Sequence, residues 1–129
     1  MNIDKEFGIH AKALELRSRR AQVLAANLAN ADTPNYKAKD IDFRTALKSA
    51  AAQQGVNIRT TNSRHIGTSS PARQPEVYYR EASQNTLDGN TVDSQIEQAQ
   101  FMQNAIRYQA TLTFLTGKVK GLMSAIRGE

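Results

Sequence analysis

Residues 91–127, TVDSQIEQAQFMQNAIRYQATLTFLTGKVKGLMSAIR, contain no proline and repeat with the period of a helix. Uncharged residues follow one another in it at alternating spacings of four and three: Phe101, Ala105, Tyr108, Leu112, Leu115, Val119, Leu122 and Ile126. This heptad row, called the seam below, is typical of helices that pack as coiled coils. The sequence therefore predicts one continuous helix here, about 55 Å long.

This C-terminal helix is predicted to make contacts on more than one side. A second, separate apolar row consists of Val92, Ile96, Ala99, Ile106 and Ala110. Asn90 with Asp93 three residues later resembles a capping box, which predicts that the helix begins after Asn90. Such a helix is longer than a compact domain of this size is wide, since its radius of gyration would be on the order of 14 Å. We expect the helix to protrude or to be embedded in something larger.

Residues 1–31 form the second predicted long helix. They also lack proline, and one apolar row recurs every seven residues through Phe7, Leu14, Ala21 and Leu28. A thinner row lies about 180° away, through Ile9, Leu16 and Val23. Two apolar faces indicate contacts on two sides, because a surface helix of a monomer needs only one. The predicted fold class is mainly α, with long N-terminal and C-terminal helices paired as a coiled coil.

The middle of the chain, residues 32–90, contains all three prolines, Pro34, Pro71 and Pro75. It is predicted to be an irregular or extended insert between the two parts of a coiled-coil domain, residues 1–31 and 91–129. Two short runs favour strands, the alternating residues 56–60 and the triplet 77–79. Residues 48–55 and 67–75 are predicted to be mobile connections.

Composition excludes several classes of protein. The chain has no cysteine, which excludes disulfide frameworks, zinc knuckles and thiol nucleophiles. No apolar run approaches the roughly 18 residues of a membrane span. The N-terminus carries Asp4 and Glu6 and lacks an apolar core, so it is not a cleaved secretory signal. If the protein leaves the cytoplasm, we expect it to be exported by a route that does not depend on a cleaved secretory signal.

No arrangement of residues predicts catalysis. The two histidines, His10 and His65, have no carboxylate or hydroxyl at a spacing that indicates a catalytic dyad. Residues 88–93 superficially resemble a calcium loop, but glycine stands second instead of sixth and the glutamate at the twelfth place is missing. A turn followed by a helix cap is the better interpretation. We therefore predict no enzymatic activity, no cofactor, no metal site and no small-molecule substrate.

The basic residues are dispersed apart from one small cluster, Arg17, Arg19 and Arg20. The net charge is +5, from 17 Lys and Arg against 12 Asp and Glu. At about 100° per residue the three arginines spread around much of the helix. A solvated role, or salt bridges between subunits, is favoured over a stripe that binds phosphates.

Residues 24–40, LAANLANADTPNYKAKD, end the N-terminal helix. Asn27 and Asn30 are predicted to donate their side-chain amides to the unpaired carbonyls of the last turn. Pro34 prevents the helix from continuing, and Asn35 suits a left-handed turn. A simple helix stop explains these two residues, but it explains neither the paired asparagines nor Tyr36, which is predicted to anchor the chain after the turn.

This segment resembles the N-terminal signature of bacterial flagellar axial proteins (rod, hook and hook-associated), whose pattern runs Asn-x-Ala-Asn-x-x-Thr-Pro-Gly-Tyr. The matching positions are Asn27, Ala29, Asn30, Thr33, Pro34 and Tyr36. Asn35 replaces the glycine, and asparagine is the other residue that best tolerates positive φ. The short length, residues 37–43, 59–66 and 87–93, and the pair Asn104 and Tyr108 are similar to the proximal-rod members of this family.

The resemblance implies a structural subunit of the proximal rod, which polymerises with rod paralogues into the tube that transmits torque from the membrane ring to the hook. It implies as partners copies of the chain, other flagellar rod proteins, the membrane (MS) ring with its rod adaptor protein, and the flagellar export apparatus, and no nucleic acid. The expected location is the basal-body rod in the periplasm, reached by export without a cleaved signal peptide. Because the isolated chain could not bury all its apolar faces, its termini are predicted to be poorly ordered before assembly.

Two other functions are compatible with the residues alone. A helical coiled-coil adaptor of another export-linked apparatus would form a small stable oligomer. A basic nucleic-acid-binding helical hairpin, the less favoured alternative, would bind in a manner that weakens steeply with salt.

Overall fold

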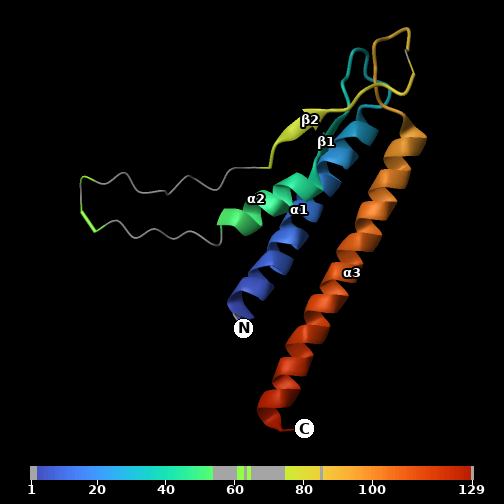
Figure 1. Ribbon diagram of the computed structural model, residues 1–129. Helices are drawn as coiled ribbons and strands as arrows, with labels where there is room; N and C mark the ends of the chain where they lie inside the picture. The colour runs from blue at the N-terminus through green and yellow to red at the C-terminus, as the bar shows by residue number, and fades with distance from the viewer. Residues whose placement is uncertain (1–2, 54–60, 63, 65–74, 85, 129) are drawn as a thin grey trace.

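A computed structural model describes residues 3–53, 61–62, 64, 75–84 and 86–128 of the chain. The elements follow in the order α1 (Ile3–Ala29), β1 (Lys39–Ile41), α2 (Phe43–Gln53), β2 (Val77–Tyr79) and α3 (Ser94–Arg127). Helices α1 and α3 lie side by side and run in opposite directions, so that the turns joining them to the rest of the chain gather at one end (Figure 1). The prediction of a mainly helical fold with long N-terminal and C-terminal helices is confirmed.

Helix α3 is the longest element, at 34 residues or about 51 Å. It continues beyond the start of α1 at the end of the molecule opposite the turns (Figure 1). The structure begins it later than the sequence suggested. Its N-cap is Asp93, whose carboxylate accepts hydrogen bonds from the backbone N–H groups of Gln95 (3.0 Å) and Ile96 (3.3 Å). Asn90, predicted as part of this cap, instead binds the end of α1. None of the helices in the described residues is long and apolar enough to cross a membrane.

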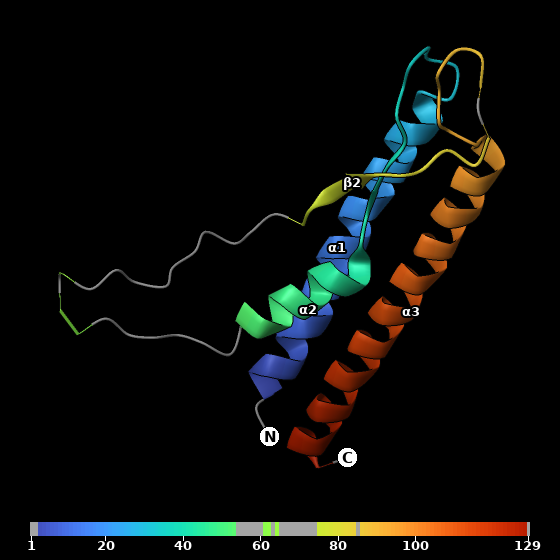
Figure 2. The same ribbon diagram turned by 45° about the horizontal axis from the view of Figure 1, so that its top comes forward.

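Strands β1 and β2 form a small antiparallel sheet in which Lys39 lies opposite Tyr79 and Ile41 opposite Val77 (Figure 2). The strand predicted at 77–79 is confirmed. Its partner β1 was not predicted, because two of its three residues, Lys39 and Asp40, are of types that are rare in strands. The strand predicted at 56–60 lies outside the described residues.

Helix α2 corrects the prediction that residues 48–55 are a mobile connection, since residues 48–53 belong to it. Asp42 precedes the helix and accepts hydrogen bonds from the Thr45 backbone N–H (3.1 Å) and hydroxyl (2.6 Å). This is the geometry of an N-cap, and the following alanines, lysine and glutamine are good helix formers. The segment was misread because its polar composition resembles that of a loop. The helix packs against α1, where the guanidinium of Arg17 lies 4.0 Å from the centre of the Phe43 ring.

The face of α3 that contacts α1 is a row adjacent to the seam. Its buried or half-buried members are Glu97, Gln100, Asn104, Tyr108, Thr111 and Leu115. Only Tyr108 and Leu115 belong to both rows. The rest of the seam is exposed on the single chain, from 36% for Phe101 to 85% for Ile126. The seam is therefore not the contact between α1 and α3, and its role in packing between chains stays a prediction.

The core within the chain is small and half polar. The buried apolar residues among those described are Ala13, Leu16, Leu24, Ala38 and Ile41, and the buried polar residues are Asn27, Asp40, Asn90, Glu97 and Asn104. On α1 the thinner predicted row through Leu16 is thus deeper than the row of Phe7 and Leu14, which are half-buried. Buried polar residues are tolerated when they are hydrogen-bonded, and each of these five makes at least one hydrogen bond within the chain. The side-chain oxygen of Asn104 is the exception and has no partner.

Candidate functional site

The turn after α1 has the left-handed conformation that the sequence predicted. Asn35 has φ 60°, which makes it the only non-glycine residue with positive φ in the described part of the chain. The backbone N–H of Tyr36 donates to the carbonyl of Thr33 (3.3 Å), which closes the turn around Pro34. Asn30 donates its side-chain amide to the Ala26 carbonyl (2.8 Å), as predicted. Ala29 ends the helix and is exposed.

Asn90 closes the C-terminal end of α1 from a distant part of the sequence. Its buried side-chain amide donates to the carbonyls of Asn30 (3.0 Å), Ala31 (2.8 Å) and Thr33 (2.9 Å). These three carbonyls belong to the turn that follows α1, and the two hydrogens of the amide are shared among them. Its oxygen accepts from the backbone N–H of Val92 (2.8 Å). Asn90 thereby joins the end of α1 to the segment that leads into α3.

Residues 86–91 form a second turn beside the first, as the turn-and-cap interpretation of 88–93 predicted. The Asp88 carboxylate accepts from the Asn90 N–H (3.1 Å), and this bond lowers the pKa of Asp88. Gly89 has φ 74°, and a Cβ built on it would lie 2.5 Å from the side-chain oxygen of Asn35. The positive φ favours glycine here, and a Cβ would in addition require the Asn35 side chain to move.

Backbone groups also connect the two turns directly. The N–H of Asn35 donates to the carbonyl of Asp88 (2.9 Å), and the N–H of Thr91 donates to the carbonyl of Tyr36 (3.0 Å). The Thr91 hydroxyl accepts from the N–H of Ala38 (2.8 Å). The signature segment and the 86–91 segment therefore form one unit, called the junction below.

Asn27 lies next to the junction, and the structure contradicts the role that the sequence predicted for it. It is fully buried, and its amide donates to the Lys39 carbonyl (2.7 Å) and to Glu97 (3.0 Å), not to the last turn of its own helix. Its oxygen accepts from the Lys39 N–H (3.0 Å) and lies 3.5 Å from the Tyr36 hydroxyl. Tyr36 is half-buried, and through this contact it anchors the chain after the turn. Asn27 thus connects α1, β1 and α3.

Four charged residues form a cluster next to Asn27 that the sequence did not reveal. Asp40 accepts hydrogen bonds from Arg20 (2.8 and 3.0 Å) and from Arg80 (2.8 Å), and Arg80 also pairs with the buried Glu97. Arg20 reaches α3 as well, through the side-chain oxygen of Gln100 (2.9 Å). The cluster joins α1, β1, α3 and the residue after β2, with two charges of each sign.

The charges in this cluster stabilise one another. Burial alone would raise the pKa of Asp40, but hydrogen bonds from Arg20, from the Ile41 N–H and from Arg80 together outweigh it, and its pKa is lowered. The bonds to Asp40 raise the pKa of Arg20. Both carboxylates have guanidinium partners within the chain, so the arrangement holds elements together and does not offer a reactive group.

The basic cluster on α1 also has a different role from the predicted one. Arg20 pairs with Asp40 inside the chain, and Arg17 lies over the Phe43 ring, where burial and the neighbouring Arg107 and Arg20 lower its pKa. The Arg17 carbonyl accepts from the amide of the buried Asn104 (2.8 Å). Neither arginine is simply solvated or reserved for a bridge between subunits.

The turn geometry predicts the effect of substitutions at Asn35. Replacing Asn35 by glycine should leave the free energy of unfolding unchanged or slightly raised, since glycine adopts positive φ without strain. Asn35→Val should lower it by about 1–2 kcal/mol, because a β-branched side chain resists this conformation. Urea unfolding of the purified variants measures both. A valine variant as stable as the parent would show that the left-handed turn does not matter for folding.

Comparison with known proteins identifies the family of this chain. A family model described as "Flagella basal body rod protein" matches residues 7–37, which cover most of α1 and the turn after it. The chain is 46% identical to the flagellar basal body rod protein FlgB of Aeromonas hydrophila, over 100% of this chain and 98% of that protein. It is 42% identical to FlgB of Salmonella typhimurium (98% and 96% covered) and 41% identical to FlgB of Escherichia coli K12 (97% and 95%). The chain therefore belongs to the FlgB family of flagellar basal body rod proteins, and it is a structural subunit of the rod.

Proposed function

We propose that the chain polymerises with copies of itself and with other rod proteins into the tube that transmits torque from the membrane ring to the hook. Its role in that tube is mechanical and involves no catalysis. The junction fixes the course of the chain at one end, and α1 and α3 supply the surfaces that neighbouring subunits cover.

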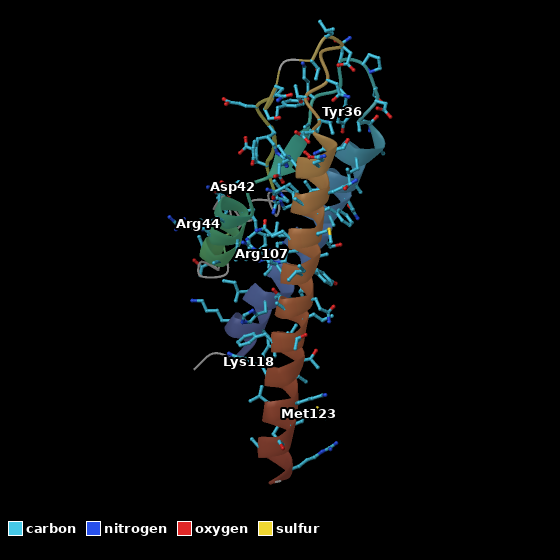
Figure 3. The ribbon with its side chains drawn as sticks, turned by 90° about the vertical axis from the view of Figure 1, so that its right-hand side faces the viewer. Tyr36, Asp42, Arg44, Arg107, Lys118 and Met123 are labelled. Atoms are coloured by element: carbon cyan, nitrogen blue, oxygen red, sulfur yellow. The ribbon has the colours of Figure 1, made fainter. Side chains whose placement is uncertain are left out.

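The observation that carries this proposal is the exposure of α3. Large apolar side chains project from it on all sides and along its whole length: Ile96, Phe101, Met102, Ile106, Leu112, Phe114, Val119, Leu122, Met123 and Ile126. Figure 3 views the molecule from the side of α3, with Lys118 and Met123 marking its distal half. Exposed apolar side chains in this number mark a surface that other chains cover, and α1 contacts only one face of the helix. Contacts with several other subunits can cover the other faces.

The same proposal extends to partners and location. The membrane (MS) ring with its rod adaptor protein and the flagellar export apparatus are the proposed neighbours at the base of the rod. The proposed location is the periplasmic part of the basal body, reached by export without a cleaved signal peptide. A core this small and a chain without cysteine suit passage in an unfolded state.

Electron microscopy of basal bodies from a strain that lacks this chain tests the proposal. We expect membrane rings without a rod, and recovery of the rod when the intact gene is restored. Basal bodies with a complete rod in the deletion strain would contradict a structural role for this chain in the rod.

A further inference from the structure

Two arginines, Arg17 of α1 and Arg107 of α3, lie near one another outside the charged cluster. The amide of Asn104 donates to the Arg17 carbonyl (2.8 Å), and Arg107 follows Asn104 by three residues, which places it on the adjoining turn of α3. In Figure 3 Arg107 lies on the side of α3 that faces α2. The two guanidinium groups are close enough for the charge of Arg107 to lower the pKa of Arg17.

Neither guanidinium has an anionic partner within the described part of the chain. The Nε of Arg17 is buried and makes no hydrogen bond, and the exposed side chain of Arg107 makes neither a hydrogen bond nor an ion pair there. The side-chain oxygen of Asn104 also lacks a partner, but an amide has no charge, so a bond to it would leave both positive charges uncompensated. Like charges at a half-buried position repel one another and favour the binding of an anion.

The nearest carboxylates of the chain are already occupied. Asp40 and Glu97 bind the arginines of the charged cluster, and Asp42 accepts hydrogen bonds from Thr45 at the start of α2. Residues 98–127, which make up most of α3, contain no acidic residue. The described elements around the two arginines therefore supply no counter-charge.

Other acidic residues stand far away along the two helices. Asp4 and Glu6 precede Arg17 by at least 11 residues, which is about 16 Å along a helix. Glu129 follows Arg107 by 22 residues and stands beyond the end of α3. A carboxylate that pairs with both arginines has to come from another chain.

Phe43 of α2 holds Arg17 in position for such a contact. The guanidinium carbon lies 4.0 Å from the centre of the Phe43 ring. A guanidinium over an aromatic ring uses its flat face, and its N–H groups point outward from its edge, where a carboxylate can accept two of them. The ring contact belongs to the fold of the single chain, and it reduces the freedom that Arg17 would lose on binding a carboxylate.

We propose that Arg17 and Arg107 together bind an aspartate or glutamate side chain of a different rod protein. The inference rests on the proposed function, assembly in the rod, and adds the chemistry of one contact between subunits. A copy of this chain is the poorer source of the carboxylate, because each copy has a net charge of +5 and repels the others. Most carboxylates of the described residues also bind groups within their own chain.

Reversing the charge of Arg107 tests the proposal, because this side chain has no partner in the single chain. The midpoint of urea unfolding of purified Arg107→Glu should be unchanged or higher, since the repulsion of Arg17 is removed. In cells, Arg107→Glu should lower the number of complete rods in electron micrographs by about tenfold or more, because a charge pair at an interface is lost. Swimming should fall with it.

The matched control is Arg44→Glu, which makes the same change at an exposed position of α2 that is also labelled in Figure 3. A glutamate in the first turn of a helix is favourable, so the fold is retained. We expect normal rods and normal swimming. Normal rods in Arg107→Glu, or equal loss of rods in both variants, would overturn the inference.

A search for compensating changes identifies the partner. Each acidic residue of the other rod proteins is replaced in turn by lysine in Arg107→Glu cells, and cells that swim are selected. We expect recovery from one such position, where the pair forms again with its charges exchanged. Recovery only from acidic positions of this chain, or from none, would overturn the inference. If Arg107→Glu does not fold, Arg107→Gln, which only removes the charge, should still lose rods while Arg44→Gln keeps them, and equal results for these two would overturn the inference. The deletion strain tests the proposed function separately.

Discussion

Replacing Asp40 by asparagine is expected to lower the free energy of unfolding by about 3–5 kcal/mol, the cost of removing one partner from a buried ion pair. Asp40 accepts hydrogen bonds from Arg20 and Arg80 and is 4% exposed. An amide has one acceptor oxygen and no charge, so Arg20 would lose its carboxylate partner in a site that little water reaches and keep at most amide oxygens. Urea unfolding of the purified chain measures the loss.

The control for this variant is Asp32→Asn, which changes an exposed carboxylate in the turn after α1. A surface substitution of this kind should change the free energy of unfolding by no more than about 0.5 kcal/mol. Equal small effects for Asp40→Asn and Asp32→Asn would mean that the charged cluster contributes little to folding.

The lowered pKa of Asp40 also predicts how stability changes with pH. A carboxyl whose pKa is lower in the folded than in the unfolded chain stabilises the fold fully above the unfolded value, which is about 4. That stabilisation is lost as the pH falls through the folded pKa. The difference in stability between the parent and Asp40→Asn should therefore shrink below about pH 4. A difference that stays constant down to the folded pKa would contradict the pairing.

The second large effect is expected at Val119, in the exposed part of the seam. Val119→Asp should abolish rod assembly and motility while leaving the single chain nearly as stable as the parent. Val119 is 41% exposed in the chain, so an aspartate there stays in water until a neighbouring subunit covers it. Burying an unpaired carboxylate then costs several kcal/mol in every contact. Urea unfolding, electron microscopy of basal bodies and swimming assays measure the three properties.

Gln98→Asp is the matched control, because it adds the same charge to an exposed position of α3 outside the seam. We expect rods and motility to be retained. Equal loss of assembly in both variants would mean that the seam has no special role between chains. A Val119→Asp chain that unfolds in isolation would show instead that the residue belongs to the fold of the single chain.

The parts of the fold that were predictable depend on neighbours in the sequence. The period of α1 and α3 and the left-handed turn at Asn35 are local properties, and the structure has all of them. The charged cluster was not predictable, because Arg20 and Asp40 are 20 residues apart and Arg80 is 40 residues further on. No spacing within one element marks such residues as partners.

The hydrogen-bond partners of Asn90 and Asn27 were also not predictable from the sequence. Each asparagine stood beside a helix end, so each was given a capping role at the nearest end. Asn90 donates to carbonyls of the turn after α1, some 60 residues earlier, and Asn27 bonds to β1 and to α3. An asparagine side chain can donate and accept hydrogen bonds at the same time. The residue type therefore predicts that the side chain is hydrogen-bonded, but the partner depends on the fold.

The seam was recognised as a heptad row, but the sequence could not say which surface covers it. α1 contacts the neighbouring row instead, where Glu97 and Asn104 find hydrogen-bond partners on α1. Buried polar groups need specific partners, whereas apolar residues accept any apolar surface. The polar row therefore finds hydrogen-bond partners within the chain, apart from the side-chain oxygen of Asn104, and the apolar row is left for contacts that the proposed assembly would supply.

Hydrogen exchange along α3 tests most directly whether this helix is completed by neighbouring subunits. In the dilute chain we predict strong protection of residues 97–104, which the junction and the charged cluster hold, and fast exchange of residues 118–127. In isolated basal bodies the whole helix should be protected. Equal strong protection of both segments in the dilute chain would contradict the account, because α3 would then need no neighbour to be stable.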